Sequence, residues 1–153
     1  VVTNPDAPVG RKHVITPSPV KVLAMEKNIP ILTPEKLRHE DLEFFGAEIG
    51  IVVAYGKIIP QSIIDMFPLG MLNIHYSLLP KYRGAAPIHW AVMNGDLETG
   101  VTVFKLKHEI DTGDIILRKT IPIGRSETTS EVHDRMMFVG AEALAEALEI
   151  HKK

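Results

Sequence analysis

Cysteine is absent from this 153-residue sequence, and aromatic residues make up only 6% of it. The absence of Cys excludes disulfides and thiolate chemistry, and it fits a reducing compartment. No apolar run approaches the ~20 residues that a membrane helix requires, and no signal-peptide pattern opens the chain. We therefore expect a soluble protein without a membrane anchor, located in the cytoplasm: bacterial cytosol, or an organelle matrix in a eukaryote.

Neither sign of charge is in excess, since 17 Lys and Arg face 19 Asp and Glu. No whole-chain field draws such a protein to nucleic acid or lipid, so any RNA contact must be local. One local exception is residues 7–25, which contain no carboxylate but do contain Arg11, Lys12, His13 and Lys21. Such a loop is usually just solvated, and the alternative is that it holds phosphates of an RNA.

Patterns for several common site types are also missing. The histidines show no metal-type spacing, and there is neither a dinucleotide fingerprint nor a phosphate-binding P-loop. We expect no metal.

The sequence alternates between segments that favour strands and segments that favour helices. Ser18-Pro19 predicts the start of a helix, and Thr33-Pro34 repeats that signal. A capping box from Thr128 to Glu131 predicts the start of the last helix. The remaining expectations are helices over 60–66 and 86–95, and strands over 49–55, 70–75, 100–107 and 115–121.

This alternation predicts an α/β fold in which a mostly parallel sheet carries helices on both faces. The chain shows no repeat, low-complexity tract or second core, so we expect one domain over residues 1–153. The opening Val1-Val2-Thr3 is typical of the end of a strand, which suggests that the chain belongs to something longer.

The end of the predicted strand over 70–75 is the strongest candidate for chemistry. Asn73 and His75 are two residues apart and so lie on one face of the strand, near its carboxyl end. In open α/β sheets, ligands bind beyond the carboxyl ends of the strands. A second polar cluster, Glu109 to Asp114, lies between the last two strands and is also what a simple hairpin turn needs. Taken alone, His75 is better explained as a strand-end residue bonded to a carbonyl. An Asp that reaches the His, beside an Asn donor, would instead suit acyl transfer to an amine.

The residues around these two clusters carry a family resemblance. Asn73-Ile74-His75-Tyr76-Ser77-Leu78-Leu79-Pro80 with Arg83-Gly84-Ala85-Ala86-Pro87, followed by Asp111-Thr112-Gly113-Asp114-Ile115, resembles the signature of the 10-formyltetrahydrofolate-dependent formyltransferases. Segments near the start of the chain resemble the branch that formylates methionyl-tRNA: Val1-Val2-Thr3-Asn4-Pro5-Asp6, Gly10-Arg11 and Thr16-Pro17-Ser18-Pro19-Val20-Lys21.

The resemblance implies a Rossmann-like formyltransferase fold and names residues for each role. Asn73, His75 and Asp111 would be the catalytic trio that moves a formyl group from 10-formyltetrahydrofolate to the α-amine of methionyl-initiator tRNA. Arg11, Lys12 and Lys21 would contact the tRNA. The folate would bind at Tyr55, Gly56, Ile58, Ser77, Leu78, Leu79, Pro80, Ile110, Thr112, Gly113 and Asp114.

The resemblance also implies what the fragment lacks and what could compete with this assignment. The family's first βα unit and its C-terminal β-barrel domain for tRNA are not in the sequence, which would therefore be a catalytic domain, expected to be a monomer. One rival is formylation of another amine, an amino-sugar nucleotide or a purine precursor, at the same site. The other is a module that binds folate and transfers nothing.

Overall fold

A computed structural model describes residues 1–151 of the protein. The chain forms two compact units. The first holds Val1–Gly46 with Tyr55–Ile59, and the second holds Ala47–Ala54 with the chain from Pro60 onward. Whether 1–153 behaves as one domain stays a prediction.

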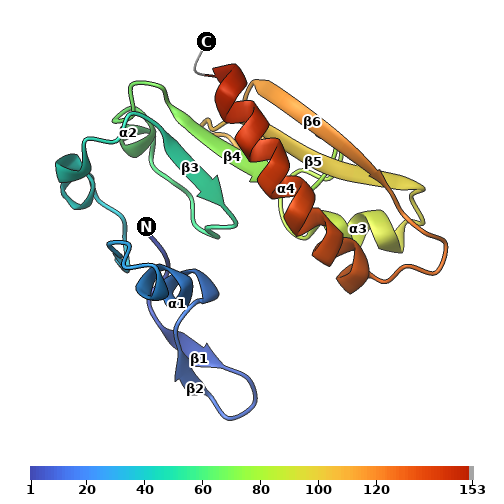
Figure 1. Ribbon diagram of the computed structural model, residues 1–153, viewed down its shortest axis with the longest axis horizontal. Coiled ribbons are helices and arrows are strands. Elements are labelled where there is room, and N and C mark those ends of the chain that lie inside the picture. The colour runs from blue at the N-terminus through green and yellow to red at the C-terminus, as the bar shows by residue number, and fades with distance from the viewer. Residues whose placement is uncertain (152–153) are drawn as a thin grey trace. The chain divides into compact units, whose positions relative to one another are not determined.

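The first unit begins with an antiparallel hairpin (Figure 1) that the sequence did not predict. Val9 pairs with Val14, so Gly10 to His13 form the turn, and the paired residues are all exposed. Ser18 caps the first helix as predicted, because its Oγ accepts a hydrogen bond from the Lys21 amide at 3.1 Å. The regular elements of this unit are β1 (Ala7–Val9), β2 (Val14–Thr16), α1 (Pro19–Glu26) and the 3-10 turns η1 (His39–Asp41) and η2 (Glu43–Phe45).

The helix expected after Thr33-Pro34 is wrong. Only the short turns η1 and η2 form there, and they bury no residue. The reason is the spacing of apolar residues: Leu37 and Leu42 are five apart, and Phe44 is 86% exposed, so no apolar stripe of helical period exists to bury.

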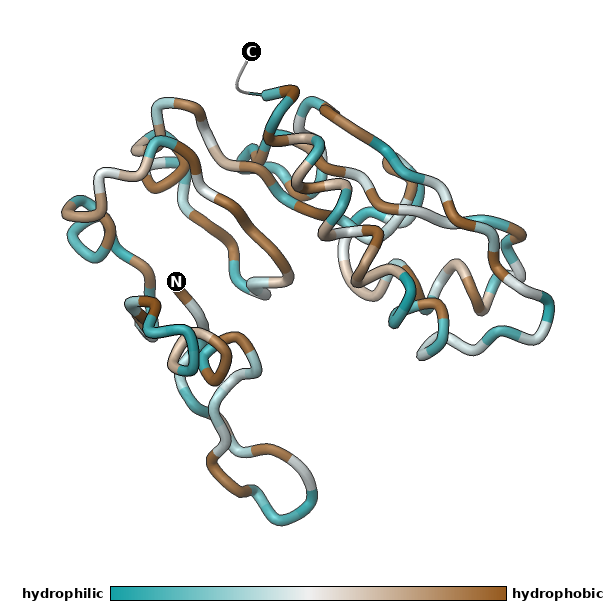
Figure 2. Tube along the Cα trace, viewed as in Figure 1, coloured by the Kyte–Doolittle hydropathy of each residue, from teal (hydrophilic) through white to brown (hydrophobic). Residues whose placement is uncertain are grey.

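The second unit contains a four-stranded sheet in the order β3-β4-β5-β6, with helices packed against it (Figure 1). Figure 2 shows that β3 is hydrophobic along most of its length, as expected for a strand in a packed sheet. The elements are β3 (Gly50–Val53), α2 (Gln61–Ile64), β4 (Met71–His75), α3 (Pro87–Met93), β5 (Glu98–Lys105), β6 (Ile115–Pro122) and α4 (Thr129–His151).

The α/β, Rossmann-like class is confirmed, but the sheet is mixed and not mostly parallel. Only β3 and β4 pair in parallel, whereas β4 with β5 and β5 with β6 pair antiparallel. The link between Lys105 and Ile115 is too short for the helical crossover that a parallel pair needs, so the chain turns back on itself. Helices on both faces of the sheet remain a prediction, because α3 and α4 contact each other and both contact β5.

The core of the second unit lies between α4 and the last two strands. Val132, Met136, Ala143 and Ala147 are fully buried and recur at helical spacing, so they form the stripe of α4 that faces the sheet. The predicted capping box is confirmed: the amide of Thr128 donates to Glu131 Oε2 at 2.8 Å. No helix in the described part of the chain is long and apolar enough to cross a bilayer.

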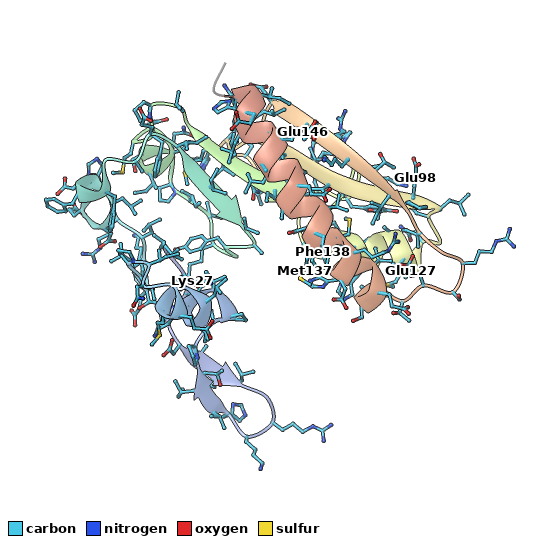
Figure 3. All side chains as sticks on the ribbon, viewed as in Figure 1. Lys27, Glu98, Glu127, Met137, Phe138 and Glu146 are labelled. Carbon is cyan, nitrogen blue, oxygen red and sulfur yellow. The ribbon has the colours of Figure 1, made fainter. Side chains whose placement is uncertain are left out.

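A second contact fixes the loop that leads into α4. The Glu127 carboxylate (Figure 3) accepts from the Gly124 amide at 2.8 Å and pairs with Arg135 Nε at 2.7 Å. Arg135 also donates to the carbonyl of Pro122 at 2.6 Å, so it ties the start of α4 to the end of β6.

Candidate active site

Strand β4 places Asn73 and His75 at the centre of the sheet. β4 is hydrogen-bonded on both sides, with Asn73 opposite Val52 of β3 and Phe104 of β5. Side chains alternate along a strand, so Asn73 and His75 face the same side. Asn73 is half-buried, and its side-chain amide makes no hydrogen bond to any described residue, which leaves its donors and acceptor open to a ligand.

His75 is buried, and both of its ring nitrogens face protein oxygens. Nε2 lies 2.7 Å from the backbone carbonyl of Tyr82, and Nδ1 lies 3.5 Å from Oδ2 of Asp111. A carbonyl can only accept, so Nε2 carries a hydrogen and donates it. This contact fixes the ring and makes Nδ1 the nitrogen that faces the acid.

Asp111 comes from the loop between β5 and β6 and is 9% exposed. Its Oδ2 accepts a hydrogen bond from the Gly84 amide at 2.7 Å, while its backbone has a φ of 52°, in the left-handed region. A Cβ at Gly113 would collide with the carbonyl of Lys105, so only glycine lets this loop lie so close to β5. The structure therefore brings together His75, from the end of β4, and Asp111, from a loop 36 positions further along the sequence, as an acyl-transfer site requires.

The turn after β4 is held by two residues that sequence reasoning missed. Thr102, fully buried on β5, donates to the carbonyl of Ser77 at 2.7 Å and accepts from the amide of Leu79 at 3.1 Å. Arg118 of β6 donates to the carbonyl of Leu79 at 2.7 Å. Neither contact has a local sequence signal, because each joins residues more than 20 positions apart.

The arrangement has the parts needed to move protons at a reacting carbonyl. A neutral His75 with its hydrogen on Nε2 presents a basic Nδ1, and the charged form presents a donor at the same atom. The Asp111 carboxylate, within ion-pair distance, compensates that positive charge. The side-chain amide of Asn73, on the same face of the sheet, can donate a hydrogen bond to an oxyanion that forms at this carbonyl.

The residues expected at the folate divide between the two units. Tyr55, Gly56 and Ile58 lie in the first unit, and the others lie in the second. The Tyr55 hydroxyl is buried and has no hydrogen-bond partner in the described part of the chain; burial, then the charge of Asp41, raises its pKa.

In the second unit the folate set splits by exposure. Ser77, Leu79 and Gly113 are buried, Leu78 and Thr112 are half-buried, and Pro80, Ile110 and Asp114 are exposed. Ser77 Oγ donates to the carbonyl of Lys81 at 2.5 Å, and Asp114 pairs with Lys107 at 3.0 Å. Ser77 and Asp114 are thus already bonded within the protein, whereas the exposed Ile110 is not covered by it.

The basic residues expected at the tRNA differ in their surroundings. Arg11 and Lys12 are exposed at the turn of the β1–β2 hairpin. Lys21 instead lies on α1 and pairs with Asp6 at 2.7 Å. Arg11 and Lys12 therefore present their charges to solvent, while that of Lys21 is partly neutralised.

No group of three or more His, Asp or Glu within the described residues is placed to hold a metal ion.

Comparisons with known proteins give a consistent family. A family model described as "Formyl transferase" matches residues 1–148. The chain is 46% identical over 97% of its length to a protein of Pelobacter propionicus, and 48% identical over 97% to one of Bacteroides thetaiotaomicron, both named methionyl-tRNA formyltransferase. It covers 48% and 47% of those proteins, so it spans about half the length of the curated relatives that it matches.

Solved structures show the same fold. The glycinamide ribonucleotide transformylase 1 of Geobacillus kaustophilus superposes with a TM-score of 0.74 at 26% identity, covering 84% of this chain and 74% of that one. A formyltransferase from Anoxybacillus kamchatkensis, solved with tetrahydrofolate, superposes with a TM-score of 0.70 at 21% identity, covering 99% and 75%.

Proposed function

The chain belongs to the formyl transferase family, and from that premise we propose that it transfers a formyl group from 10-formyltetrahydrofolate to the α-amino group of methionyl-initiator tRNA. The observation that carries the proposal is the buried pair of His75 Nδ1 and Asp111 Oδ2, 3.5 Å apart. His75 shares its face of β4 with Asn73, whose amide bonds to no described residue. Acyl transfer to an amine needs those three kinds of group around one carbon.

The proposed reaction forms one C–N bond and breaks another. The neutral α-amine of the methionyl group attacks the formyl carbon, and the carbonyl oxygen becomes an oxyanion that the Asn73 amide stabilises by donating a hydrogen bond. Collapse of this intermediate breaks the bond from the formyl carbon to N10 of the folate. The amine nitrogen loses a proton and N10 gains one, so the reaction needs no other proton donor.

His75 and Asp111 would carry that proton. Neutral His75 accepts it from the attacking nitrogen at Nδ1 and, once charged, donates a hydrogen bond from that atom to the oxyanion before it transfers the proton to N10. Asp111 orients His75 and balances its charge. Free α-amines titrate near ~7.7–8.0, so a large fraction of the nucleophile is already unprotonated close to neutral pH.

The acceptor is assigned from the relatives and the hairpin. Relatives 46–48% identical over 97% of the chain are named for methionyl-tRNA, and the exposed Arg11 and Lys12 present positive charge at a hairpin turn. Phosphate contacts of this kind position an RNA without reading its sequence. We place Arg11 first among these contacts, Lys12 second and the paired Lys21 last.

We assign the folate to the three segments predicted from the sequence, residues 55–58, 77–80 and 110–114. Folate contacts are proposed for Tyr55, Gly56 and Ile58 of the first unit and, separately, for a set in the second unit: Ser77, Leu78, Leu79, Pro80, Ile110, Thr112, Gly113 and Asp114. We further propose that the protein acts as a monomer in the cytosol, or in an organelle matrix, where initiator tRNA is charged.

The direct test is formyl transfer by the full-length protein. Purified protein is incubated with 10-formyltetrahydrofolate and, in separate reactions, methionyl-initiator tRNA, an amino-sugar nucleotide or glycinamide ribonucleotide. We expect product only with the tRNA, and a loss of at least about 100-fold in kcat for Asn73→Ala, as for removal of other oxyanion donors. Transfer only to one of the other two amines refutes the tRNA assignment, and transfer to none of the three refutes the enzymatic proposal.

A further inference from the structure

The carbonyl that holds His75 belongs to Tyr82, a residue with an unusual backbone. Tyr82 has a φ of 56°, a left-handed conformation that strains the backbone of a residue with a bulky side chain. Its carbonyl oxygen lies 2.7 Å from His75 Nε2. A residue in this conformation persists only where its surroundings hold it, so the position of this carbonyl depends on what anchors Tyr82.

The anchor is a cluster of polar side chains beside the end of α3. The Tyr82 hydroxyl donates to Asp96 Oδ2 at 2.8 Å and accepts from Asn94 Nδ2 at 2.9 Å. Lys81 Nζ donates to the same Asp96 oxygen at 2.7 Å and lies 5.1 Å from the centre of the Tyr82 ring. The Asp96 side chain is only 17% exposed. The hydrogen bond from Lys81 lowers the pKa of Asp96, which keeps the carboxylate ionised.

Asp96 is itself fixed by the helix. Its amide donates to the carbonyl of Ala91 at 3.0 Å, and the intervening Gly95 takes a φ of 67°. These are the contacts of a helix that ends at a left-handed glycine. The C-terminal end of α3 thus holds Asp96, Asp96 holds Tyr82, and the Tyr82 carbonyl holds His75.

The hydrogen bond at Nε2 decides which nitrogen of His75 is free to act. An imidazole whose Nε2–H is donated to a carbonyl keeps its lone pair on Nδ1, the atom that faces Asp111. Without that carbonyl, the neutral ring can place its hydrogen on Nδ1 and donate it to the carboxylate. Nδ1 would then be unable to accept a proton from an attacking amine.

We infer that Tyr82 is a positioning residue for His75, and that its hydroxyl, anchored by Asp96 together with Lys81 and Asn94, maintains the reactive Nε2–H tautomer. The consequence for turnover rests on the proposed formyl transfer, whereas the effect on the His75 ring does not. A purely structural role for the cluster would affect the stability of the turn and leave the His75 tautomer unchanged.

The test observes the ring nitrogens of His75 by ¹H–¹⁵N NMR in the full-length protein, near pH 8. Their signals are assigned by their loss in His75→Gln. Tyr82→Phe removes only the hydroxyl and keeps the backbone carbonyl, and Asp96→Asn keeps the size of the anchor while removing its charge. Tyr76→Phe is the matched control, because the Tyr76 hydroxyl lies beside Gly140 and bonds to no described residue.

We expect His75 of the wild-type protein to show the Nε2–H pattern. In Tyr82→Phe the two nitrogen shifts should move toward each other, as the tautomers mix; Asp96→Asn should give a smaller change, and Tyr76→Phe none. In the transfer assay, kcat should fall about tenfold for Tyr82→Phe with KM for the folate unchanged, a part of the ~100-fold or more that a general base contributes.

Unchanged His75 shifts in both Tyr82→Phe and Asp96→Asn would overturn the inference, as would equal shifts in the Tyr76→Phe control. A wild-type protein that transfers no formyl group but shows the expected shifts would refute the proposed function and leave the positioning role standing. The two failures are therefore distinguishable.

Discussion

Asp111 has two roles in the structure that a pair of substitutions can separate. Its Oδ2 accepts the Gly84 amide at 2.7 Å, which holds two loops together, and it faces His75 Nδ1 at 3.5 Å, which we assign to catalysis. Asp111→Asn keeps a side-chain oxygen that can accept from Gly84 but removes the charge. Asp111→Ala removes both.

The expected magnitudes follow from these contacts. A hydrogen bond to a charged acceptor contributes about 1.5–3 kcal/mol. Asp111 also has a φ of 52°, which Asn tolerates well and Ala poorly, at roughly 1 kcal/mol. Asp111→Ala should therefore lower the free energy of unfolding by about 2.5–4 kcal/mol, and Asp111→Asn by less than about 1 kcal/mol. Both should lower kcat by about 100-fold or more, because both remove the acid beside His75.

Stability is measured by urea unfolding and kcat by formyl transfer at saturating substrates, with folate affinity measured separately. Folate binding should stay within about tenfold, or ~1.4 kcal/mol, in both variants. If the Asp111→Asn variant is stable and its kcat is close to that of the wild type, the catalytic assignment of the carboxylate is refuted. A stable Asp111→Ala protein would show that the bond to Gly84 matters less than the geometry implies.

Two further predictions concern the RNA contact and the last helix. Arg11→Ala should weaken methionyl-tRNA binding and reduce by about 1 the slope of log affinity against log salt, with folate affinity unchanged; an unchanged slope would count against a phosphate contact. Lys21→Ala, which removes a lysine already paired with Asp6, is the control and should change the slope less. In Glu131, hydrogen bonds from the amide and then the hydroxyl of Thr128 lower the pKa below its usual 4.5. The stability that the ionised Glu131 carboxylate contributes is thus present above pH 4.5 and is lost as the pH falls through the pKa of Glu131 in the folded protein. The stability difference between wild type and Glu131→Gln in urea should shrink as the pH falls below that value, and a difference that stays constant would contradict the cap.

Elements whose ends depend on neighbouring residues could be predicted from the sequence. The start of α1 at Ser18 and the capping box at Thr128 both involve residues three positions apart, and the apolar stripe of α4 needs only its own sequence. The strand over β4 and the shared face of Asn73 and His75 follow from the two-residue period. These features are local, and the structure agrees with them.

Features that leave no pattern in the local sequence could not be predicted. The β1–β2 hairpin buries nothing, so its sequence has no alternation to reveal it. The direction of β5 and β6 depends on where a chain turns back, which strand composition does not encode, and the sheet was for that reason expected to be mostly parallel.

The same limit applies to the site. The residues alone left the pairing of His75 with Asp111 open, as one of two interpretations, and the resemblance of two motifs to a known family assigned it to Asp111. The roles of Thr102 and of Tyr82 with Asp96 had no such pattern, because each depends on contacts between side chains and backbone that are far apart in sequence.

The most direct test of the central claim, that His75 and Asp111 act as one unit, is a double-mutant cycle on kcat. His75→Ala, Asp111→Asn and the double variant are compared in the full-length protein with saturating folate and methionyl-tRNA. If the acid acts through the imidazole, the double variant should turn over within about threefold of His75→Ala alone. If the two losses multiply instead, the residues act independently and the account of the site is wrong.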